Sequence, residues 1–310
     1  MVTYKNGNYT VLFDEKNGSK VRFNKLDSLV PEFPECIDCR ISSRCIVGCP
    51  VCYEGNTVDG VYGDILNQKW VDSLHPYTEL AIGGNEPLHP DLIPFLEKLK
   101  AKKVFASMTV NQSTFERYFG LISKLCNEKL IYGLGVSLVD PNPDFLAKFK
   151  MFPNGVLHVI NGVLTKKQID ALRGKDLKML ILGYKNLGRG IDYLKHEEDI
   201  VLSNQAVLKN EIWNGLADEF AVLSFDNLAI SQLDIKGMFE RDGKDWGKFF
   251  MGKDSEYTFY IDAVNHKFAG SSLAQDKFDM TDDVTEMFNV IRGKYALADR
   301  FKTIADQKFE

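Results

Sequence analysis

The sequence predicts an α/β fold: a partial (β/α)6 barrel preceded by an N-terminal hairpin and followed by a C-terminal α+β extension. From about residue 35, short apolar runs alternate with helical stretches of about ten to fifteen residues, which is typical of βαβ units and a parallel sheet. Six such units curl a sheet toward a barrel without the eight that a complete barrel needs. With 310 residues, 45% of them hydrophobic, the chain can bury a substantial core.

The N-terminal segment 8–23 predicts a β-hairpin, because two β-rich runs flank Asn17-Gly18, a strong signal for a tight turn. The strands that we expect in the barrel are residues 36–42, 79–82, 103–110, 130–138, 156–160 and 178–182. The helices expected between them are residues 65–73, 90–100, 114–127, 144–149 and 166–172. The helix at 90–100 starts with Pro-Asp and ends with lysines, as the polarity of helices favours.

After residue 182 the regular alternation weakens. We expect a charged helical stretch at 191–220, two strand-like runs within 221–235 and a second hairpin at 257–272. The last expected element is an amphipathic helix at 282–295, with one apolar face formed by Val284, Met287, Phe288 and Ile291. The pattern as a whole predicts three parts, which are a hairpin at 1–30, the barrel at 31–235 and an extension at 236–310 that packs on the barrel.

Three cysteines in the run Cys-Ile-Val-Gly-Cys-Pro-Val-Cys form the most informative motif. Cys45, Cys49 and Cys52 have the spacing C-x3-C-x2-C and are followed directly by the aromatic Tyr53. Thiolates suit an iron-sulfur cluster, and a four-iron cluster held by three cysteines leaves one iron open for a substrate or cofactor. An open coordination position indicates chemistry, because structural metal sites are usually closed by four ligands.

A structural zinc site is a competing interpretation, with a fourth ligand from His89 or Cys39. Cys36 and Cys39 have C-x2-C spacing but lie in a predicted strand, where positions three apart point to opposite faces. We therefore expect structural thiols there, with an auxiliary ligand role and zinc binding as open alternatives. Cys126 lies on a predicted amphipathic helix, where we expect it to be a small buried hydrophobe.

A second motif, Gly-Gly-Asn-Glu-Pro at residues 83–87, follows the second predicted strand. Adjacent glycines let another molecule approach the backbone closely, so exposed amides and carbonyls can grip a polar ligand. Taken alone, such a pair is more typical of a tight turn.

Together, the cysteine run, the Gly-Gly-x-Glu-Pro loop and the repeating βα units resemble the radical S-adenosylmethionine superfamily over residues 35–185. The likeness is greatest to the branch of molybdenum-cofactor cyclases and peptide maturases, whose fourth strand often carries Val-Ser-Leu-Asp. Here Val-Ser-Leu at 136–138 is followed by Val139 before Asp140, a departure of one place. Maturases with an auxiliary-cluster domain usually carry many C-terminal cysteines. This chain has none after Cys126, so the resemblance implies a single cluster in a barrel of the radical S-adenosylmethionine type.

The resemblance implies that Cys45, Cys49 and Cys52 hold a [4Fe-4S] cluster whose open iron binds the amino and carboxylate groups of S-adenosylmethionine. It also implies reductive cleavage of S-adenosylmethionine to a 5′-deoxyadenosyl radical that abstracts hydrogen from a substrate. Contacts to S-adenosylmethionine are implied for residues of both motifs and of the strand ends, which are Tyr53, Gly83, Gly84, Asn85, Glu86, Pro87, Asn111, Ser137 and Asn161. For Ser137 a local hydrogen bond, and for Asn111 and Asn161 a turn role, remain open alternatives.

The segment after the sixth predicted strand is expected to reach the catalytic edge. Its side chains Tyr184, Lys185 and Arg189 are candidates for binding an anionic substrate group or the cofactor carboxylate, whereas a glycine turn with solvated charges is the alternative. For His89 and His158 we expect packing or loop capping, because no carboxylate partner is evident. The substrate itself, whether a small molecule, a nucleotide or a peptide, is not specified by these residues.

Composition bounds the partners and the compartment. The formal net charge of −5 argues against a protein that depends on broad contact with nucleic-acid phosphates. No apolar signal region opens the sequence and no run approaches a membrane span, and six cysteines with three clustered suit a reducing compartment, so we expect a cytoplasmic protein. The resemblance implies reduced flavodoxin or ferredoxin as electron donor. An enzyme is the leading hypothesis, and an iron-sulfur sensor without cleavage and a structural zinc protein are the alternatives.

Overall fold

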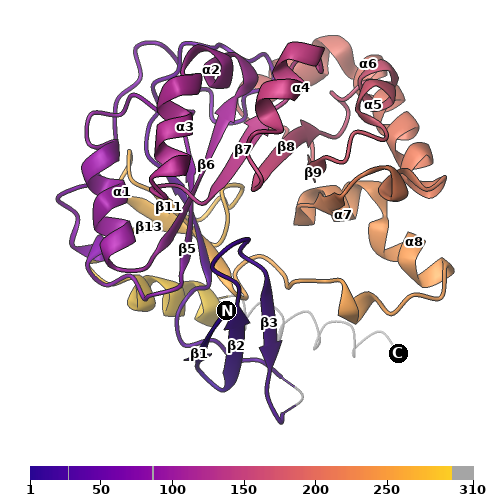
Figure 1. Ribbon diagram of the computed structural model, residues 1–310. Helices are drawn as coiled ribbons and strands as arrows, with labels where there is room; N and C mark the ends of the chain where they lie inside the picture. Colours follow the sequence, from indigo (N-terminus) through magenta and orange to yellow (C-terminus); the bar gives the residue numbers. More distant parts are fainter. Residues whose placement is uncertain (27, 86, 295–310) are drawn as a thin grey trace.

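A ten-stranded sheet is the centre of the computed structural model, which describes residues 1–26, 28–85 and 87–294 (Figure 1). Its strand order is β10-β9-β8-β7-β6-β5-β4-β11-β12-β13, and neighbouring strands from β10 to β11 run parallel. All six strands predicted before residue 182 are present as β4 Cys36–Arg40, β5 Glu79–Gly83, β6 Phe105–Asn111, β7 Gly133–Ser137, β8 Gly155–Ile160 and β9 Lys178–Leu182. The predicted α/β class with a large parallel sheet is therefore confirmed.

Strands from the C-terminal third extend this sheet at both edges. β10 Val222–Phe225 pairs with β9, and β11 Thr258–Asp262 lies parallel to β4 although the two are far apart in the sequence. β12 Lys267–Ala269 and β13 Phe278–Asp279 continue antiparallel from β11. The hairpin expected at 257–272 is thus present as β11 and β12, and it belongs to the main sheet.

Helices follow the strands and lie in an arc around the sheet (Figure 1). They are α1 Leu92–Ala101, α2 Gln112–Arg117, α3 Phe119–Asn127, α4 Pro143–Phe149 and α5 Lys166–Leu172. The helix expected at 114–127 is divided at Tyr118, where φ of −110° and ψ of 27° depart from helical geometry. It also begins earlier than expected, because the Asn111 side chain caps α2.

The helix expected at 65–73 was wrong. Only a short 3-10 turn forms there, η1 Lys69–Val71. The carboxylate of Asp64 accepts hydrogen bonds from the backbone N–H groups of Leu66 and Asn67, at 3.3 and 3.1 Å, which holds a turn in place of a helical start. The apolar spacing reflects burial of side chains such as Trp70 in the core, and not a helical period.

The C-terminal third is mostly helical before β11. It contains α6 Arg189–Trp213, η2 Leu216–Glu219, α7 Asn227–Leu233, α8 Ile235–Arg241 and η3 Trp246–Lys248. The second strand-like run expected within 221–235 was wrong and forms α7, because Asp226 Oδ1 accepts from the N–H of Ala229 at 2.7 Å and caps a helix there. Within the described part of the chain, none of the helices is long and apolar enough to cross a membrane.

The amphipathic C-terminal helix is confirmed over residues 284–294, and residue 295 lies outside the described residues. The face predicted to be apolar is buried, at 2% exposure or less, for Val284, Met287, Phe288 and Ile291. These side chains join the main hydrophobic core.

A small three-stranded sheet of β1 Val2–Asn6, β2 Tyr9–Phe13 and β3 Lys20–Phe23 packs beside the start of β4. The predicted hairpin is confirmed as β2 and β3, with Gly18 in its turn at φ of 76°, whereas β1 was not predicted. The aromatic side chains of Phe13 and Phe105 meet edge to face with ring centroids 4.9 Å apart. The small sheet therefore covers the amino ends of the large sheet and leaves the carboxyl ends free.

The two faces of β4 have different surroundings. Ile37 and Cys39 belong to the core between the sheet and its helices. Cys36, Asp38 and Arg40 alternate with them and lie on the opposite face, where they are half-buried or exposed. The expectation that Cys36 and Cys39 point to opposite faces is therefore confirmed.

Candidate functional site

The three cysteines of the motif lie in a loop after the carboxyl end of β4, and residues 45–52 are called the cysteine loop below. The backbone N–H of Cys45 donates to the carbonyl of Thr57 at 2.7 Å, and that of Cys52 donates to the carbonyl of Cys49 at 3.2 Å. Cys45 is buried, whereas Cys49 and Cys52 are half-buried. The loop thus presents thiols at the edge of the sheet where α/β proteins bind ligands.

The three thiols are chemically suitable metal ligands, but they do not lie close enough together to form a complete metal site. Across residues 1–26, 28–85 and 87–294, no three His, Cys, Asp or Glu side chains come close enough together to hold a metal ion. Burial raises the pKa of Cys49, the neighbouring Cys52 and Cys45 raise it further, and Arg189 lowers it. Soft thiolates fit an iron-sulfur cluster chemically, and binding one would require the thiols to converge and lose protons.

The Gly-Gly loop, residues 83–87, lies beside the segment that leads into the cysteine loop. Gly84 has a left-handed φ of 111°, and a Cβ at this position would lie 3.0 Å from the carbonyl oxygen of Ser42. Glycine meets both conditions, so the close approach predicted for this turn is made to the chain's own backbone. Asn85 has φ of 56°, a conformation that asparagine tolerates. Pro87 is buried, and Glu86 lies outside the described residues.

Two asparagine amides connect the Gly-Gly loop and the end of β6 to the cysteine loop. Nδ2 of Asn85 donates to Sγ of Cys45 at 3.3 Å and to Oγ1 of Thr114 at 3.1 Å. Nδ2 of Asn111 lies 3.5 Å from Sγ of Cys49, and the backbone N–H of Asn111 donates to Oδ1 of Asn85 at 2.6 Å. The structure therefore brings together two motifs that are separate in the sequence.

The other polar residues expected at the strand ends share this edge of the sheet. Ser137 ends β7 and lies in register with Asn111 on β6 and with His158 on β8. Asn161 follows β8, is buried, and donates from Nδ2 to Oε1 of Gln232 at 3.0 Å. Its Oδ1 is buried without a hydrogen-bond partner among the described residues. Contact of either residue with S-adenosylmethionine stays a prediction.

Arg189, at the start of α6, holds the cysteine loop from the outside. Its N–H donates to the carbonyl of Cys52 at 3.0 Å, its Nε to that of Cys49 at 2.7 Å and its Nη1 to that of Asn56 at 2.8 Å. The preceding Gly188 has φ of 53°, and a Cβ there would lie 2.5 Å from the carbonyl oxygen of Tyr53. We expected Arg189 to face a substrate, but most of its donors are directed at the loop backbone.

Tyr184 also differs from its expected substrate-facing role, because it is buried and its hydroxyl donates to the carbonyl of Gly190 at 2.7 Å. Lys185 does approach the site. Its Nζ lies 3.8 Å from the ring centroid of Tyr53 and 3.3 Å from Oγ of Ser272. Burial lowers the pKa of Lys185, and carboxylates around it, including that of Asp38, act in the opposite direction.

Sequence reasoning missed Asp38, which lies in the middle of β4 on the same face as Cys36. Its side chain is exposed and makes no hydrogen bond or ion pair within the described part of the chain. Desolvation by the surrounding protein nevertheless raises the pKa of Asp38 to about 6, with Lys185 acting to lower it. A carboxylate in the middle of a strand was the available signal.

The zinc alternative is not supported by its proposed fourth ligands. His89 is buried, with Nε2 2.9 Å from the carbonyl of Gly63 and Nδ1 accepting from the N–H of Asp91 at 3.1 Å, so both ring nitrogens are engaged in capping a loop. Cys39 is 1% exposed within the hydrophobic core. His158 is packed, as expected, and burial lowers its pKa to about 4.

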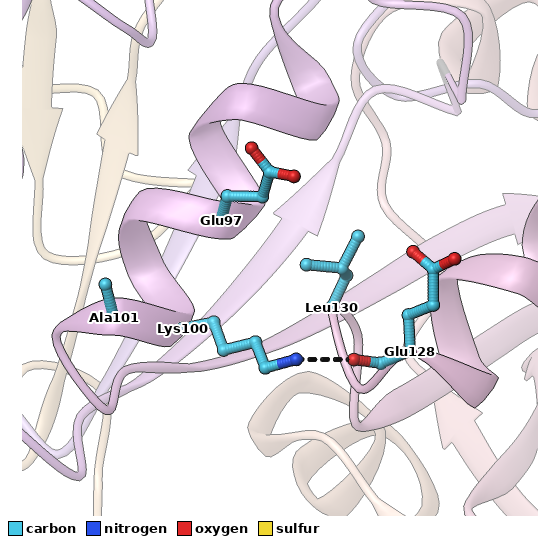
Figure 2. Close-up of a pocket in the computed structure, with 5 residues that line it drawn as sticks. All are labelled: Glu97, Lys100, Ala101, Glu128 and Leu130. Atoms are coloured by element: carbon cyan, nitrogen blue, oxygen red, sulfur yellow. Dashed lines mark hydrogen bonds between the residues drawn. The ribbon is translucent and has the colours of Figure 1, made fainter.

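Two surface hollows differ in their relation to the site. One lies on the outer helical layer between α1 and the end of α3, where Lys100 Nζ donates to the carbonyl of Glu128 at 2.7 Å (Figure 2). It is lined by Glu97, Lys100, Ala101, Glu128 and Leu130 and contains no residue of either motif. The other, of about 180 Å³, borders the cysteine loop and is lined by Ile46, Val47, Ser113, Thr114 and Arg117.

Comparison with known proteins finds similarity in structure but not in sequence. No protein-family model matches the chain, and no curated protein sequence matches it. Solved structures do match, over most of the chain, at low sequence identity. These matches show that the fold of this chain is similar to that of the solved structures.

The particular neighbours are structures of SuiB from Streptococcus suis. SuiB bound to the precursor peptide SuiA has a TM-score of 0.57 and 14% identity, and the match covers 85% of this chain and 67% of SuiB. SuiB bound to S-adenosylmethionine has a TM-score of 0.50 and 14% identity, with 86% and 68% covered. A third structure, of SuiB, has a TM-score of 0.50 and 14% identity, and the match covers 85% of this chain and 68% of SuiB. At this identity the likeness concerns the fold.

Proposed function

We propose that the protein is a radical S-adenosylmethionine enzyme in which Cys45, Cys49 and Cys52 hold a [4Fe-4S] cluster. The observation that carries the proposal is the contact of the Gly-Gly loop with the cysteine loop, from Asn85 to Cys45 at 3.3 Å. When bound, the cluster and S-adenosylmethionine would supply reductive cleavage to methionine and a 5′-deoxyadenosyl radical that abstracts hydrogen from the substrate. The protein's own residues would position the reactants and exclude water.

We infer that β4 to β9 with their helices form a partial (β/α)6 barrel of the radical S-adenosylmethionine type. The parallel strand order and the fold likeness to SuiB support this inference. The same inference divides the chain into a hairpin at 1–30, the barrel at 31–235 and an extension at 236–310. Because parallel strands end at one edge, the loops after β4, β5, β6 and β7 would surround one cofactor.

The residues proposed for S-adenosylmethionine lie on these loops. Backbone groups of the Gly-Gly loop, at Gly83, Gly84 and Pro87, would line its methionine end, with Glu86 steadying the loop. Tyr53 would lie near the adenine. Asn111, Ser137 and Asn161 would contact the carboxylate or ribose, and the buried Oδ1 of Asn161, which has no partner among the described residues, supports such a ligand contact.

A peptide is the substrate class that we favour, because one SuiB structure contains a precursor peptide. A small molecule or nucleotide is the other outcome. Lys185 and Asp38 are the side chains that we propose to face the substrate. Lys185 lies over the ring of Tyr53, and the exposed Asp38 of β4 is among the carboxylates that act on the pKa of Lys185. We further propose reduced flavodoxin or ferredoxin as donor of the electron, and a cytoplasmic location.

Anaerobic reconstitution with iron and sulfide, followed by dithionite and S-adenosylmethionine, tests the proposal. We expect a brown protein with about four irons per chain, and release of 5′-deoxyadenosine and methionine. A bound cluster without cleavage would favour the sensor. A colourless protein that retains zinc and rejects iron would contradict both.

Single substitutions Cys45→Ala, Cys49→Ala and Cys52→Ala should each abolish iron retention and cleavage, because each removes one of three proposed ligands. Cys36→Ala is the matched control, since Cys36 lies in β4 and outside the cysteine loop. It should keep the cluster, measured as iron per chain and as the visible absorption of the cluster. Loss of the cluster in Cys36→Ala would show that the assignment of ligands is wrong.

A further inference from the structure

The amide of Asn111 has a fixed orientation. Its Oδ1 accepts hydrogen bonds from both the backbone N–H and the hydroxyl of Ser113, each at 2.9 Å, which makes it the N-cap of α2. A backbone N–H can only donate, so the oxygen of this amide must face Ser113. The NH₂ group is therefore directed to the other side, where Sγ of Cys49 lies 3.5 Å away.

The amide of Asn85 is oriented in the same manner. Its Oδ1 accepts from the backbone N–H of Asn111 at 2.6 Å, and its NH₂ group faces Sγ of Cys45 at 3.3 Å and Oγ1 of Thr114 at 3.1 Å. The backbone at Asn85 is left-handed, with φ of 56°. Two backbone donors thus force two amide NH₂ groups onto two of the three sulfurs.

We infer that Asn85 and Asn111 are positioning residues that donate hydrogen bonds to the sulfurs of Cys45 and Cys49, holding these ligands and raising the reduction potential of the cluster. The inference rests on the proposed function. A sulfur that carries negative charge accepts hydrogen bonds well, and such bonds favour the more negative, reduced state of a cluster. Outer groups that hydrogen-bond to ligands also hold them in place for the metal.

Asn111→Ser is the principal test. Serine is as good an N-cap as asparagine, so α2 keeps its cap, but the shorter side chain cannot reach Cys49 and adds no charge. We expect the reconstituted variant to lose iron to a chelator at least about 10-fold faster than the unchanged protein. Its reduction potential, measured by titration followed by electron paramagnetic resonance, should shift to a more negative value.

The matched control is Asn142→Ser. Asn142 is the N-cap of α4, where its Oδ1 accepts from the N–H of Phe145 at 2.9 Å, and it lies outside both motif loops. This variant should retain iron and potential as the unchanged protein does. Asn111→Asp and Asn85→Asp provide nearly isosteric second variants, because a carboxylate keeps the accepting role toward Ser113 or Asn111 but cannot donate to sulfur. Both should lose iron faster, with urea denaturation of the cluster-free protein checking that folding is kept.

The outcomes separate this inference from the proposed function. Iron retention and potential equal to those of the unchanged protein in Asn111→Ser would overturn the inference while the proposed function stands. If Asn111→Ser disturbs folding, iron retention in Asn111→Asp decides, and an unchanged rate there overturns it. Failure of the unchanged protein to assemble any cluster would overturn both.

Discussion

The two ends of β4 are held in different ways. Before the strand, Glu35 is 1% exposed and accepts from the hydroxyl of Tyr9 at 2.5 Å and from Nε of Arg22 at 2.9 Å, with Nζ of Lys20 at 3.7 Å. After the strand, the cysteine loop is held mainly through its backbone, as by Arg189. Side-chain charges are present at both ends, since Arg40 at the carboxyl end pairs with Asp262 at 3.3 Å and with Glu54 at 3.4 Å. The carboxyl end differs because it also presents the thiols of the cysteine loop.

The difference matches the division of labour in parallel α/β folds, where the amino ends of the strands serve stability and the carboxyl ends carry function. Buried polar atoms without hydrogen-bond partners among the described residues include Nη2 of Arg189 and Oδ1 of Asn161 at the carboxyl end, and Oε2 of Glu35 at the amino end. Left-handed backbone occurs at the carboxyl end, at Gly84, Asn85 and Gly188, and also just before strands, at Tyr77 and Lys103.

Replacing Glu35 by Ala tests the amino end and should have the largest effect on stability. It would leave Arg22, at 14% exposure on β3, without its carboxylate, whereas Lys20 would keep its ion pair with Glu79 at 2.6 Å. We expect a loss of about 3–5 kcal/mol in the free energy of unfolding, measured by urea denaturation of the cluster-free protein. Glu32→Ala, at an exposed position, should change it little. A loss below about 1 kcal/mol would contradict the comparison.

Replacing Gly188 by Ala tests the carboxyl end, where function should suffer more than stability. The new Cβ would lie 2.5 Å from the carbonyl of Tyr53 at a left-handed φ of 53°. We expect a cost of about 2 kcal/mol in the free energy of unfolding and a large fall in iron retained after reconstitution. Gly55→Ala is the matched control, because Gly55 has φ of 65° but no atom within 4 Å of its added Cβ. Equal iron loss in both variants would assign the effect to backbone strain alone.

Local signals in the sequence predicted those parts of the fold that local chemistry determines. The helix predicted at 166–172 has these bounds in the structure, where Thr165 and Gln168 form a capping box. The strands β4 to β9 followed from apolar runs between turn residues. By contrast, the pairing of β11 with β4 joins distant segments and has no local signal. The turn at 65–73 was mistaken for a helix because tertiary burial, and not a helical period, placed its apolar residues.

In the candidate site too, local sequence patterns were predicted and contacts between distant segments were not. The spacing of the cysteines and the glycine pair are local patterns, so both loops were predicted, and the contact between Asn85 and Cys45 links them. The contacts of Arg189 with the cysteine loop were not predicted, because they depend on where α6 begins in space, and its contact with a substrate stays a prediction. Asp38 was missed since its neighbours on β4 are apolar or thiol side chains, and only the sheet reveals which face it shares.

Asp38 gives the smallest expected effect and tests whether the surrounding protein desolvates this face of β4. Its pKa is raised to about 6 when folded, above its ordinary value of 3.8. A raised pKa in an acid means that the folded state binds the proton more tightly, so its contribution to stability is lost as pH rises from about 4 to about 6.

Asp38→Asn should therefore stabilise the protein at pH 8 relative to pH 4.5. Because the side chain is exposed, we expect a gain of at most about 1 kcal/mol in urea denaturation. The gain is measured against Asp59→Asn, the same substitution at another exposed position. An equal gain in Asp38→Asn at both pH values would contradict the raised pKa of Asp38.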